Sequence, residues 1–207
     1  MTNVSRAASK FGEWVGLTGA PGFFKSENVI DLIIADHREA ESLYDKYKAT
    51  TDQDEKQLIA NNLVKVLVKH DECEQLLVYP LLREKIGGER GEQLYERSLK
   101  EHQDHRELLY NVKCTSLKTD PEFDAKLQKA IDSVFHHVKE EEEEVLPLLR
   151  EHVTEDELRY VGTSFKAHKP LTATRPHPSA PAQGYPAALA NVVLKPIDMV
   201  RDMLEGH

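Results

Sequence analysis

Two histidine–glutamate pairs are the residues most able to do chemistry in this sequence. His70 is followed four residues later by Glu74, and His137 is followed four residues later by Glu141. Residues four apart lie on one face of an α-helix, with Cβ atoms about 5–6 Å apart, so each pair can reach one metal centre together. Imidazole nitrogens and carboxylate oxygens suit iron, with zinc and manganese as competitors.

The two pairs belong to an internal repeat. The segment HDECEQLLVYPLLRE (70–84) aligns without a gap with HVKEEEEEVLPLLRE (137–151). The segments around two further histidines, DHREAESL (36–43) and EHQDHREL (101–108), also echo each other. The sequence therefore consists of two similar halves, each with one lone histidine and one His-x-x-x-Glu pair.

These polar residues interrupt stripes that are otherwise apolar. On the predicted second helix, Leu63 and Leu67 precede the first pair, and Leu77 and Leu81 follow it with the same helical spacing. Polar groups in a buried stripe are costly unless they are paired or bind a ligand. We therefore predict one metal site within a helical bundle, with six ligands: His37, His70, Glu74, His102, His137 and Glu141.

Two further histidines lie close in the sequence to predicted ligands. His105 follows His102 by three residues and shares nearly the same helix face, so it is either an additional ligand or a hydrogen-bonding neighbour. His136 points about 100° away from His137 on a helix, and we expect it outside the site.

The elements that must position these residues are all helical. Hydrophobic periodicity predicts helices at about 28–49, 54–86, 89–117 and 121–151, followed by a short helix at about 155–167. The proline-rich segment 169–186 is either a linker or an extended strap. A last amphipathic helix, at about 187–205, is predicted to pack back through Leu194, Ile197, Val200 and Leu204.

These elements predict an all-α fold. Four long helices joined by short connections favour an up-down-up-down four-helix bundle. The predicted organisation is an N-terminal arm (1–27), the bundle (28–152), and a region with a short helix, a strap and a C-terminal helix (153–207).

Composition limits the classes of function. The net charge of −9 and the lack of a basic stripe argue against a nucleic-acid partner. No apolar run is long enough to span a membrane. Two cysteines fit a reducing compartment, so we expect a cytoplasmic protein. The alternative is a mitochondrial protein, because the arm carries Arg6 and Lys10 with no acidic residue before Glu13.

Residues 28–152 resemble the hemerythrin-like (HHE cation-binding) family through the lone histidines and the doubled His-x-x-x-Glu motif followed by an apolar pair and proline. The resemblance implies two iron ions with an oxo or hydroxo bridge, which Zn or Mn can replace. It also implies that Glu74 and Glu141 bridge the metals and that four histidines are terminal ligands. Oxygen-carrying hemerythrins have two histidines spaced by four on the third helix, whereas His102 and His105 are three apart.

We therefore expect a non-haem di-iron protein that binds O2, peroxide or NO in sensing, storage or stress response. A peroxidase- or oxidase-like enzyme and an iron-homeostasis protein are the alternatives. The two glutamates bring less negative charge than the roughly four carboxylates of ferritin-like di-iron enzymes. This difference favours binding oxygen over cleaving it.

Overall fold

The computed structural model describes residues 26–181 and 184–204. The predicted N-terminal arm (1–27) lies outside the described residues except for its last two positions. The described residues form helices and contain no strand, which confirms the all-α prediction.

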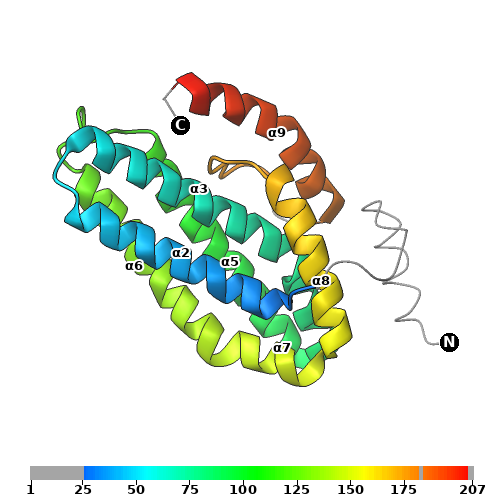
Figure 1. The fold of residues 1–207 in the computed structure, drawn as a ribbon. Coiled ribbons are helices and arrows are strands. Elements are labelled where there is room, and N and C mark those ends of the chain that lie inside the picture. The colour runs from blue at the N-terminus through cyan, green and yellow to red at the C-terminus, as the bar shows by residue number, and fades with distance from the viewer. Residues whose placement is uncertain (1–25, 182–183, 205–207) are drawn as a thin grey trace.

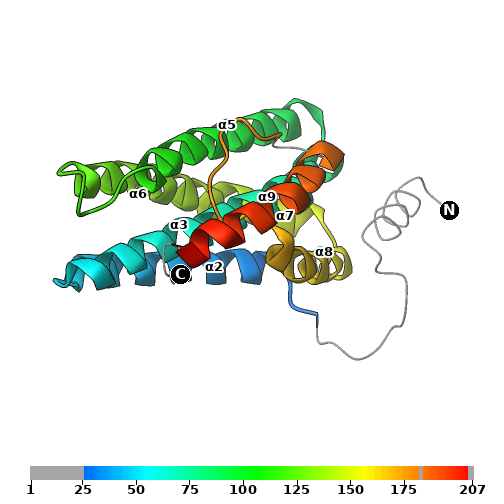
Figure 2. The ribbon, with the colours of Figure 1, turned by 90° about the horizontal axis from the view of Figure 1, so that it is seen from above.

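Four long helices make the body of the molecule: α2 (Val29–Ala49), α3 (Gln53–Leu77), α5 (Gly88–Lys113) and α6 (Phe123–Glu140). Helix α2 packs along α3, and α5 packs along α6. Figure 2 shows these pairs as two layers, so the predicted bundle is confirmed. No helix in the described part of the chain is long and apolar enough to cross a membrane.

Side-chain caps explain where several helices begin. The side chain of Asn28 accepts a hydrogen bond from the backbone N–H of Ile30 at the start of α2, and Asp52 accepts one from Glu55 at the start of α3. Such caps satisfy backbone donors that have no partner within the helix. The helix starts predicted from sequence lie within one or two residues of these positions.

Both helices that carry a histidine–glutamate pair change geometry just after the pair. Helix α3 ends at Leu77 and is followed by α4 (Tyr79–Leu81) and the π-turn η1 (Leu82–Ile86). Helix α6 runs into the π-turn η2 (Glu141–Val145) and then α7 (Leu146–His152). Pro80 and Pro147 lie near these breaks. Proline lacks the backbone N–H that a continuous helix needs, so it favours a break at these positions. The helices predicted at 54–86 and 121–151 are thus each divided into segments near the two prolines, where proline is expected to kink or end a helix.

The C-terminal region packs back on the bundle. Helix α8 (Glu155–His168) and the short η3 (Lys169–Leu171) lead to a strap whose residues Thr172, Thr174 and Arg175 are buried. Helix α9 (Gly184–Leu204) then lies beside α3 and the strap (Figure 1). The strap is thus a packed segment.

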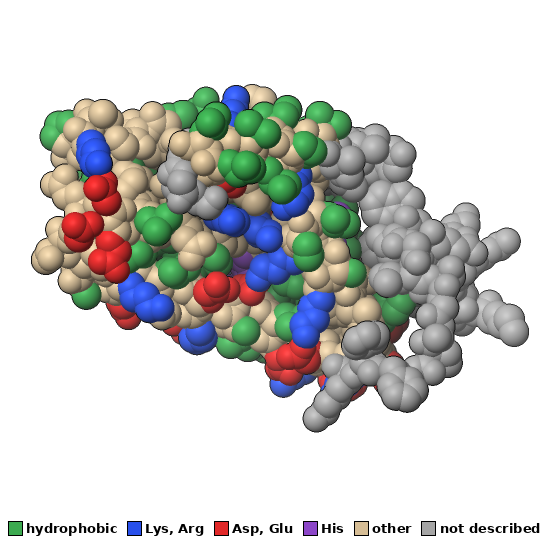
Figure 3. Space-filling view, turned by 45° about the horizontal axis from the view of Figure 1, so that its top comes forward, with side chains coloured by type: hydrophobic (Ala, Val, Ile, Leu, Met, Phe, Trp, Pro, Cys, Tyr) green, Lys and Arg blue, Asp and Glu red, His purple; other side chains and the backbone are tan. Residues whose placement is uncertain are grey.

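The packing face predicted for α9 is wrong. Ile197, Val200 and Leu204 are 46%, 59% and 83% exposed, whereas Leu194 is partly buried. The buried residues among those described on α9 are Asn191, Asp198 and Asp202. Figure 3 shows the hydrophobic side chains that this leaves on the surface over α9. The carboxylates are buried because they hydrogen-bond the strap, an arrangement that hydrophobic periodicity does not detect.

The hydrophobic core is divided into two clusters. One contains Ile33, Leu77 and Leu149, and the other contains Ala40, Leu67 and Val134. On α2 the boundary falls between Ile33 and Ala40, where His37 lies buried. A layer of buried polar residues therefore separates two apolar clusters.

Candidate metal centre

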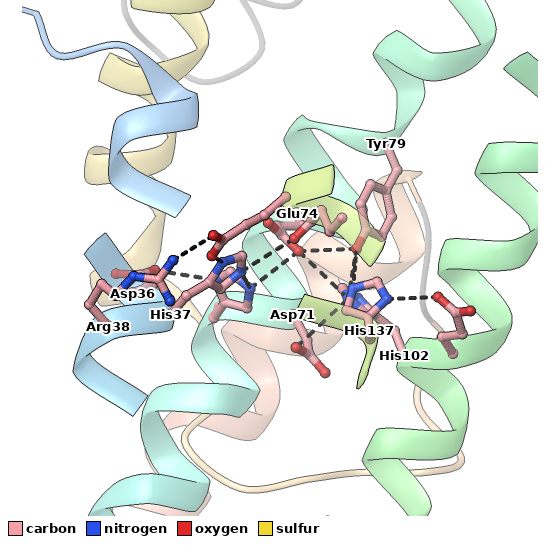
Figure 4. A network of polar contacts seen from close by, with 12 residues as sticks. Asp36, His37, Arg38, Asp71, Glu74, Tyr79, His102 and His137 are labelled. Carbon is pink, nitrogen blue, oxygen red and sulfur yellow. Dashed lines mark hydrogen bonds and ion pairs between the residues drawn. The ribbon is translucent and has the colours of Figure 1, made fainter. Parts of the chain in front are cut away.

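All six predicted ligands are buried in this polar layer. The exposed fraction of each is 4% or less, and each of the four bundle helices contributes one histidine. Figure 4 shows that the side chains of His37, Glu74, His102 and His137 point toward one another from different helices. The predicted helical register is correct: His137 faces the interior, whereas His136 is exposed and pairs with Glu140.

Four of the six residues form a first group of atoms close enough to share an ion: His37, His70, Glu74 and Glu141. The Nε2 atoms of His37 and His70 lie 3.2 Å apart. His37 Nε2 is 3.3 Å from a Glu141 oxygen, and His70 Nε2 is 3.3 Å from a Glu74 oxygen.

A second group contains Glu74, His102 and His137. The Nε2 atoms of these two histidines lie 3.1 Å apart, and His102 Nε2 is 3.6 Å from the Oε2 atom of Glu74. The same Oε2 atom contacts His70. Glu74 thus lies between the two groups, in the position that a bridging carboxylate requires, whereas Glu141 belongs to the first group only.

Tyr79 reaches the second group from the break after α3. Its hydroxyl donates a hydrogen bond to Glu74 Oε2 over 3.0 Å and lies 2.7 Å from His102 Nε2 and 3.3 Å from His137 Nε2. In Figure 4 its ring comes down onto these histidines from the opposite side to Asp71. Tyr79 was not among the site residues predicted from sequence.

A third group joins Asp71, His102 and His105. His105 is buried, and its Nδ1 lies 3.6 Å from an oxygen of Asp71. Its ring centroid is 5.2 Å from that of His137. The structure therefore places His105 beside the predicted ligands, in a position compatible with either of the roles expected for it.

Outer carboxylates contact three of the predicted ligand histidines on the ring nitrogen that faces away from the centre. His37 Nδ1 is 2.8 Å from Glu142, and His137 Nδ1 is 2.7 Å from Glu101. His70 Nδ1 is 3.4 Å from Asp36. A carboxylate in this position fixes the tautomer and orientation of a histidine and increases its basicity as a ligand.

Cations balance some outer carboxylates but not the inner pair. Lys169 pairs with Asp36, and Arg38 pairs with Glu142. Among the described residues no lysine or arginine pairs with Glu74 or Glu141. Because an unpaired buried charge costs several kcal/mol, a cation between these groups would stabilise them.

The electrostatics of the two inner carboxylates differ. Burial and the neighbouring charge of Glu141 raise the pKa of Glu74 well above its usual range. Burial also acts to raise the pKa of Glu141, but contact with His37 and the charges of His137 and His37 lower it to about 2. Without a cation, one carboxylate is thus protonated so that the other can ionise.

The pKa values of the predicted ligand histidines also shift in opposite directions. Burial lowers the pKa of His102 well below its usual value, so its ring is neutral and ready to bind a metal. Burial also opposes charge on His37 and His137, but carboxylates raise the pKa of both: Glu141 and Glu142 act on His37, and Glu101 and Glu141 act on His137. A metal would displace protons from these two rings.

The residues fit a pair of metal ions. An octahedral metal with bonds of about 2.1 Å separates adjacent ligand atoms by about 3.0 Å. Within each group the closest contacts between predicted ligand atoms lie between 3.1 and 3.6 Å. Oε1 of Glu74 and both oxygens of Glu141 are buried without a well-directed hydrogen bond. These atoms are available to metals.

The sequence contained a signal for two of the outer carboxylates. Asp36 precedes His37, and Glu101 precedes His102 at the equivalent position of the other half. Each acid contacts the histidine of the neighbouring helix, so Asp36 meets His70 and Glu101 meets His137. The similarity between DHREAESL and EHQDHREL is therefore a sequence signal that these two acids have equivalent roles, each contacting a histidine of the neighbouring helix.

The comparisons with known proteins agree with the geometry. The model of the hemerythrin HHE cation-binding domain matches residues 28–149. An uncharacterised hemerythrin-like protein of Schizosaccharomyces pombe is 34% identical over 183 residues, which cover 88% of this chain and 89% of that protein. A DNA nickase of Nostoc sp. is 28% identical over 167 residues, which cover 80% of this chain but only 46% of that protein. No solved structure matched the chain. The chain belongs to the hemerythrin HHE cation-binding domain family.

Proposed function

We propose that this protein holds two iron ions between its helices and binds O2, peroxide or NO there, in sensing, storage or stress response. The proposed ligands are His37, His70, Glu74, His102, His137 and Glu141. The observation that carries the proposal is the position of Glu74, which lies within reach of two histidines on each side while buried with no lysine or arginine partner in the described part of the chain.

The donor set supports iron over a purely structural metal. Mixed imidazole and carboxylate donors suit iron, although zinc and manganese compete for such ligands. Two iron ions bound there would supply a reversible Fe(II)/Fe(III) couple and exchangeable positions for a small ligand. The apolar clusters on both sides of the polar layer limit water around the centre.

Ligand charge supports binding over oxygen cleavage. The two inner carboxylates oppose the four positive charges of two ferrous ions only in part, whereas ferritin-like di-iron enzymes supply about four carboxylates. The outer carboxylates act through histidines and contribute less charge directly. We therefore rank reversible ligand binding above a peroxidase- or oxidase-like activity.

A role in iron homeostasis is the second candidate, and one observation favours it. Glu74 and Glu141 are fully buried side by side, so the metal-free centre is electrostatically unfavourable. Metal binding is then coupled to folding, and the stability of the bundle would report the iron supply. The activity named for the Nostoc relative is not carried over, because a net charge of −9 opposes contact with DNA phosphates.

Metal analysis with visible absorption spectroscopy tests the proposal. We expect about two iron ions per chain in protein loaded anaerobically with Fe(II), and an absorption change on adding O2 that reverses when O2 is removed. Glu74→Ala should lose iron from both positions, because one carboxylate serves both. A Glu74→Ala protein with a full complement of iron would refute the bridging role.

The neighbouring histidines of α6 provide a matched control. His137→Ala should lose iron, whereas His136→Ala, which removes an exposed imidazole one residue away, should retain it. Equal losses from the two variants would contradict the proposed ligand set. Absorption that changes irreversibly, together with turnover of peroxide and a reductant, would favour the enzymatic alternative.

A further inference from the structure

The internal repeat is broken at two chemically important positions, Asp71, which lies opposite Val138, and Tyr79. Alignment of residues 70–84 with 137–151 places Tyr79 opposite Leu146. Leu146 packs in the apolar cluster, whereas the Tyr79 hydroxyl contacts three polar atoms of the site. Tyr79 thus brings to the site an oxygen atom that the other half of the repeat does not supply.

The distances around this oxygen are those expected between atoms bound to one metal. Tyr79 Oη lies 2.7 Å from His102 Nε2, 3.0 Å from Glu74 Oε2 and 3.3 Å from His137 Nε2. Adjacent ligand atoms of an octahedral ion with bonds of about 2.1 Å are about 3.0 Å apart. The hydroxyl therefore stands in the same relation to the second group as its three members do to one another.

The two groups are unequal without this oxygen. The first group has four donors, including both inner carboxylates, and the second has Glu74, His102 and His137, with an oxygen of Asp71 farther away, 3.8 Å from His102 Nε2. A tyrosine oxygen gives the second group a fourth donor and a second source of negative charge. It is also fully buried, so its position depends on the fold and not on solvent.

We propose that Tyr79 is a ligand of the iron ion held by His102 and His137, to which it contributes a phenolate oxygen. This inference rests on the proposed function. When ferric iron binds, an iron–oxygen bond forms, the O–H bond breaks, and the proton leaves to solvent. The two iron positions are therefore chemically inequivalent, and the tyrosine side favours the ferric state because phenolate is a hard anionic donor.

Spectroscopy of the iron-loaded full-length protein tests the assignment. The protein is loaded anaerobically with Fe(II) and oxidised with air, and iron content, visible absorption and resonance Raman spectra are recorded. We expect a phenolate-to-iron charge-transfer band, with tyrosinate ring vibrations enhanced on excitation into it. Tyr79→Phe should lose the band and the vibrations while keeping most of its iron.

Tyr47→Phe is the matched control. Tyr47 is another buried tyrosine, but its hydroxyl donates to Asp124 over 2.6 Å in the cluster on the other side of the polar layer. This variant should keep the band. If Tyr79→Phe cannot hold iron, the wild-type Raman spectrum decides: bound iron without tyrosinate vibrations overturns the assignment.

The outcomes separate this inference from the proposed function. Iron-loaded wild type and Tyr79→Phe with identical spectra would show that Tyr79 only donates a hydrogen bond to Glu74, and the di-iron proposal would stand. A wild-type protein that takes up no iron would refute both the Tyr79 assignment and the di-iron proposal.

Discussion

At the scale of single residues, the centre depends on carboxylates that do not face it. A histidine ring can rotate about its side-chain bonds, so an imidazole needs a second contact to point at a metal. Glu101 provides this contact for His137, and Glu142 provides it for His37. His102 has no such partner for Nδ1, and its ring is held by burial and by Tyr79 instead.

This arrangement leads to a prediction for Glu101→Gln. Glutamine keeps the size of the side chain but removes the charge beside His137, so the ring becomes less basic and less well oriented. We expect iron affinity to fall by about 10–100-fold, measured by competition with a chelator of known affinity. Glu96→Gln, on the exposed side of the same helix, is the control. Equal affinities for both variants would show that packing alone orients His137.

At the scale of elements, the breaks after the ligand pairs are as important as the helices. In a continuous helix Tyr79, five residues beyond Glu74, would point about 140° away from it. The break at Val78 and the following Pro80 redirect the chain, and Tyr79 enters the site. The π-helical segment η1, which begins at Leu82, is then capped by Gly87, whose φ of +67° suits glycine.

Gly91 holds this redirected segment against α5. A Cβ atom at Gly91 would lie 2.3 Å from the carbonyl oxygen of Leu82, which is far too close. Alanine normally stabilises a helix by about 1 kcal/mol relative to glycine. Here we expect Gly91→Ala to destabilise the protein by about 1–3 kcal/mol, because η1 must move away from the helix.

Thermal and chemical denaturation measure this effect. Lys100→Ala, an exposed substitution on the same helix, should leave the free energy of unfolding nearly unchanged. A Gly91→Ala protein that is more stable than wild type would mean that η1 adjusts without cost. The contact between η1 and α5 would then not determine where Tyr79 lies.

These elements also explain how far the sequence could predict the site. The spacing of His70 and Glu74 is a property of any α-helix, so their common direction followed from sequence alone. Tyr79 was not predicted because its direction depends on the geometry of the helix break beside Pro80, which helical periodicity does not give. The packing face of α9 was mispredicted because Asp198 is buried by hydrogen bonds and not by hydrophobicity.

At the scale of the whole molecule, the C-terminal region is joined to the bundle by polar contacts near the centre. Asn191 of α9 accepts a hydrogen bond from the backbone N–H of Ala173 in the strap and donates one to Glu72 on α3. Arg106 on α5 donates to the same carboxylate over 3.0 Å. Glu72 is adjacent in the chain to Asp71 of the third group, so this network links the strap, α9 and two ligand-bearing helices.

Asp198 is the residue on which the attachment of the strap to α9 depends most. It is fully buried, and one of its oxygens accepts hydrogen bonds from the backbone N–H groups of Thr174 and Arg175 over 3.0 and 3.1 Å. His177 also contacts Asp198, over 3.0 Å. Removing this carboxylate leaves two buried donors without a partner, at a cost of about 1–3 kcal/mol each.

We therefore expect Asp198→Ala to release the strap and α9 while the four bundle helices remain folded. Hydrogen exchange should become faster between Thr172 and Leu204, and limited proteolysis should cut there first, because local opening no longer has to break these bonds. Iron content should stay unchanged, since no proposed ligand lies in this region. Asp45→Ala, an exposed substitution on α2, is the control. If hydrogen exchange accelerated equally throughout the bundle, or if iron were lost as well, the C-terminal region would be an integral part of the cooperative unit that holds the centre.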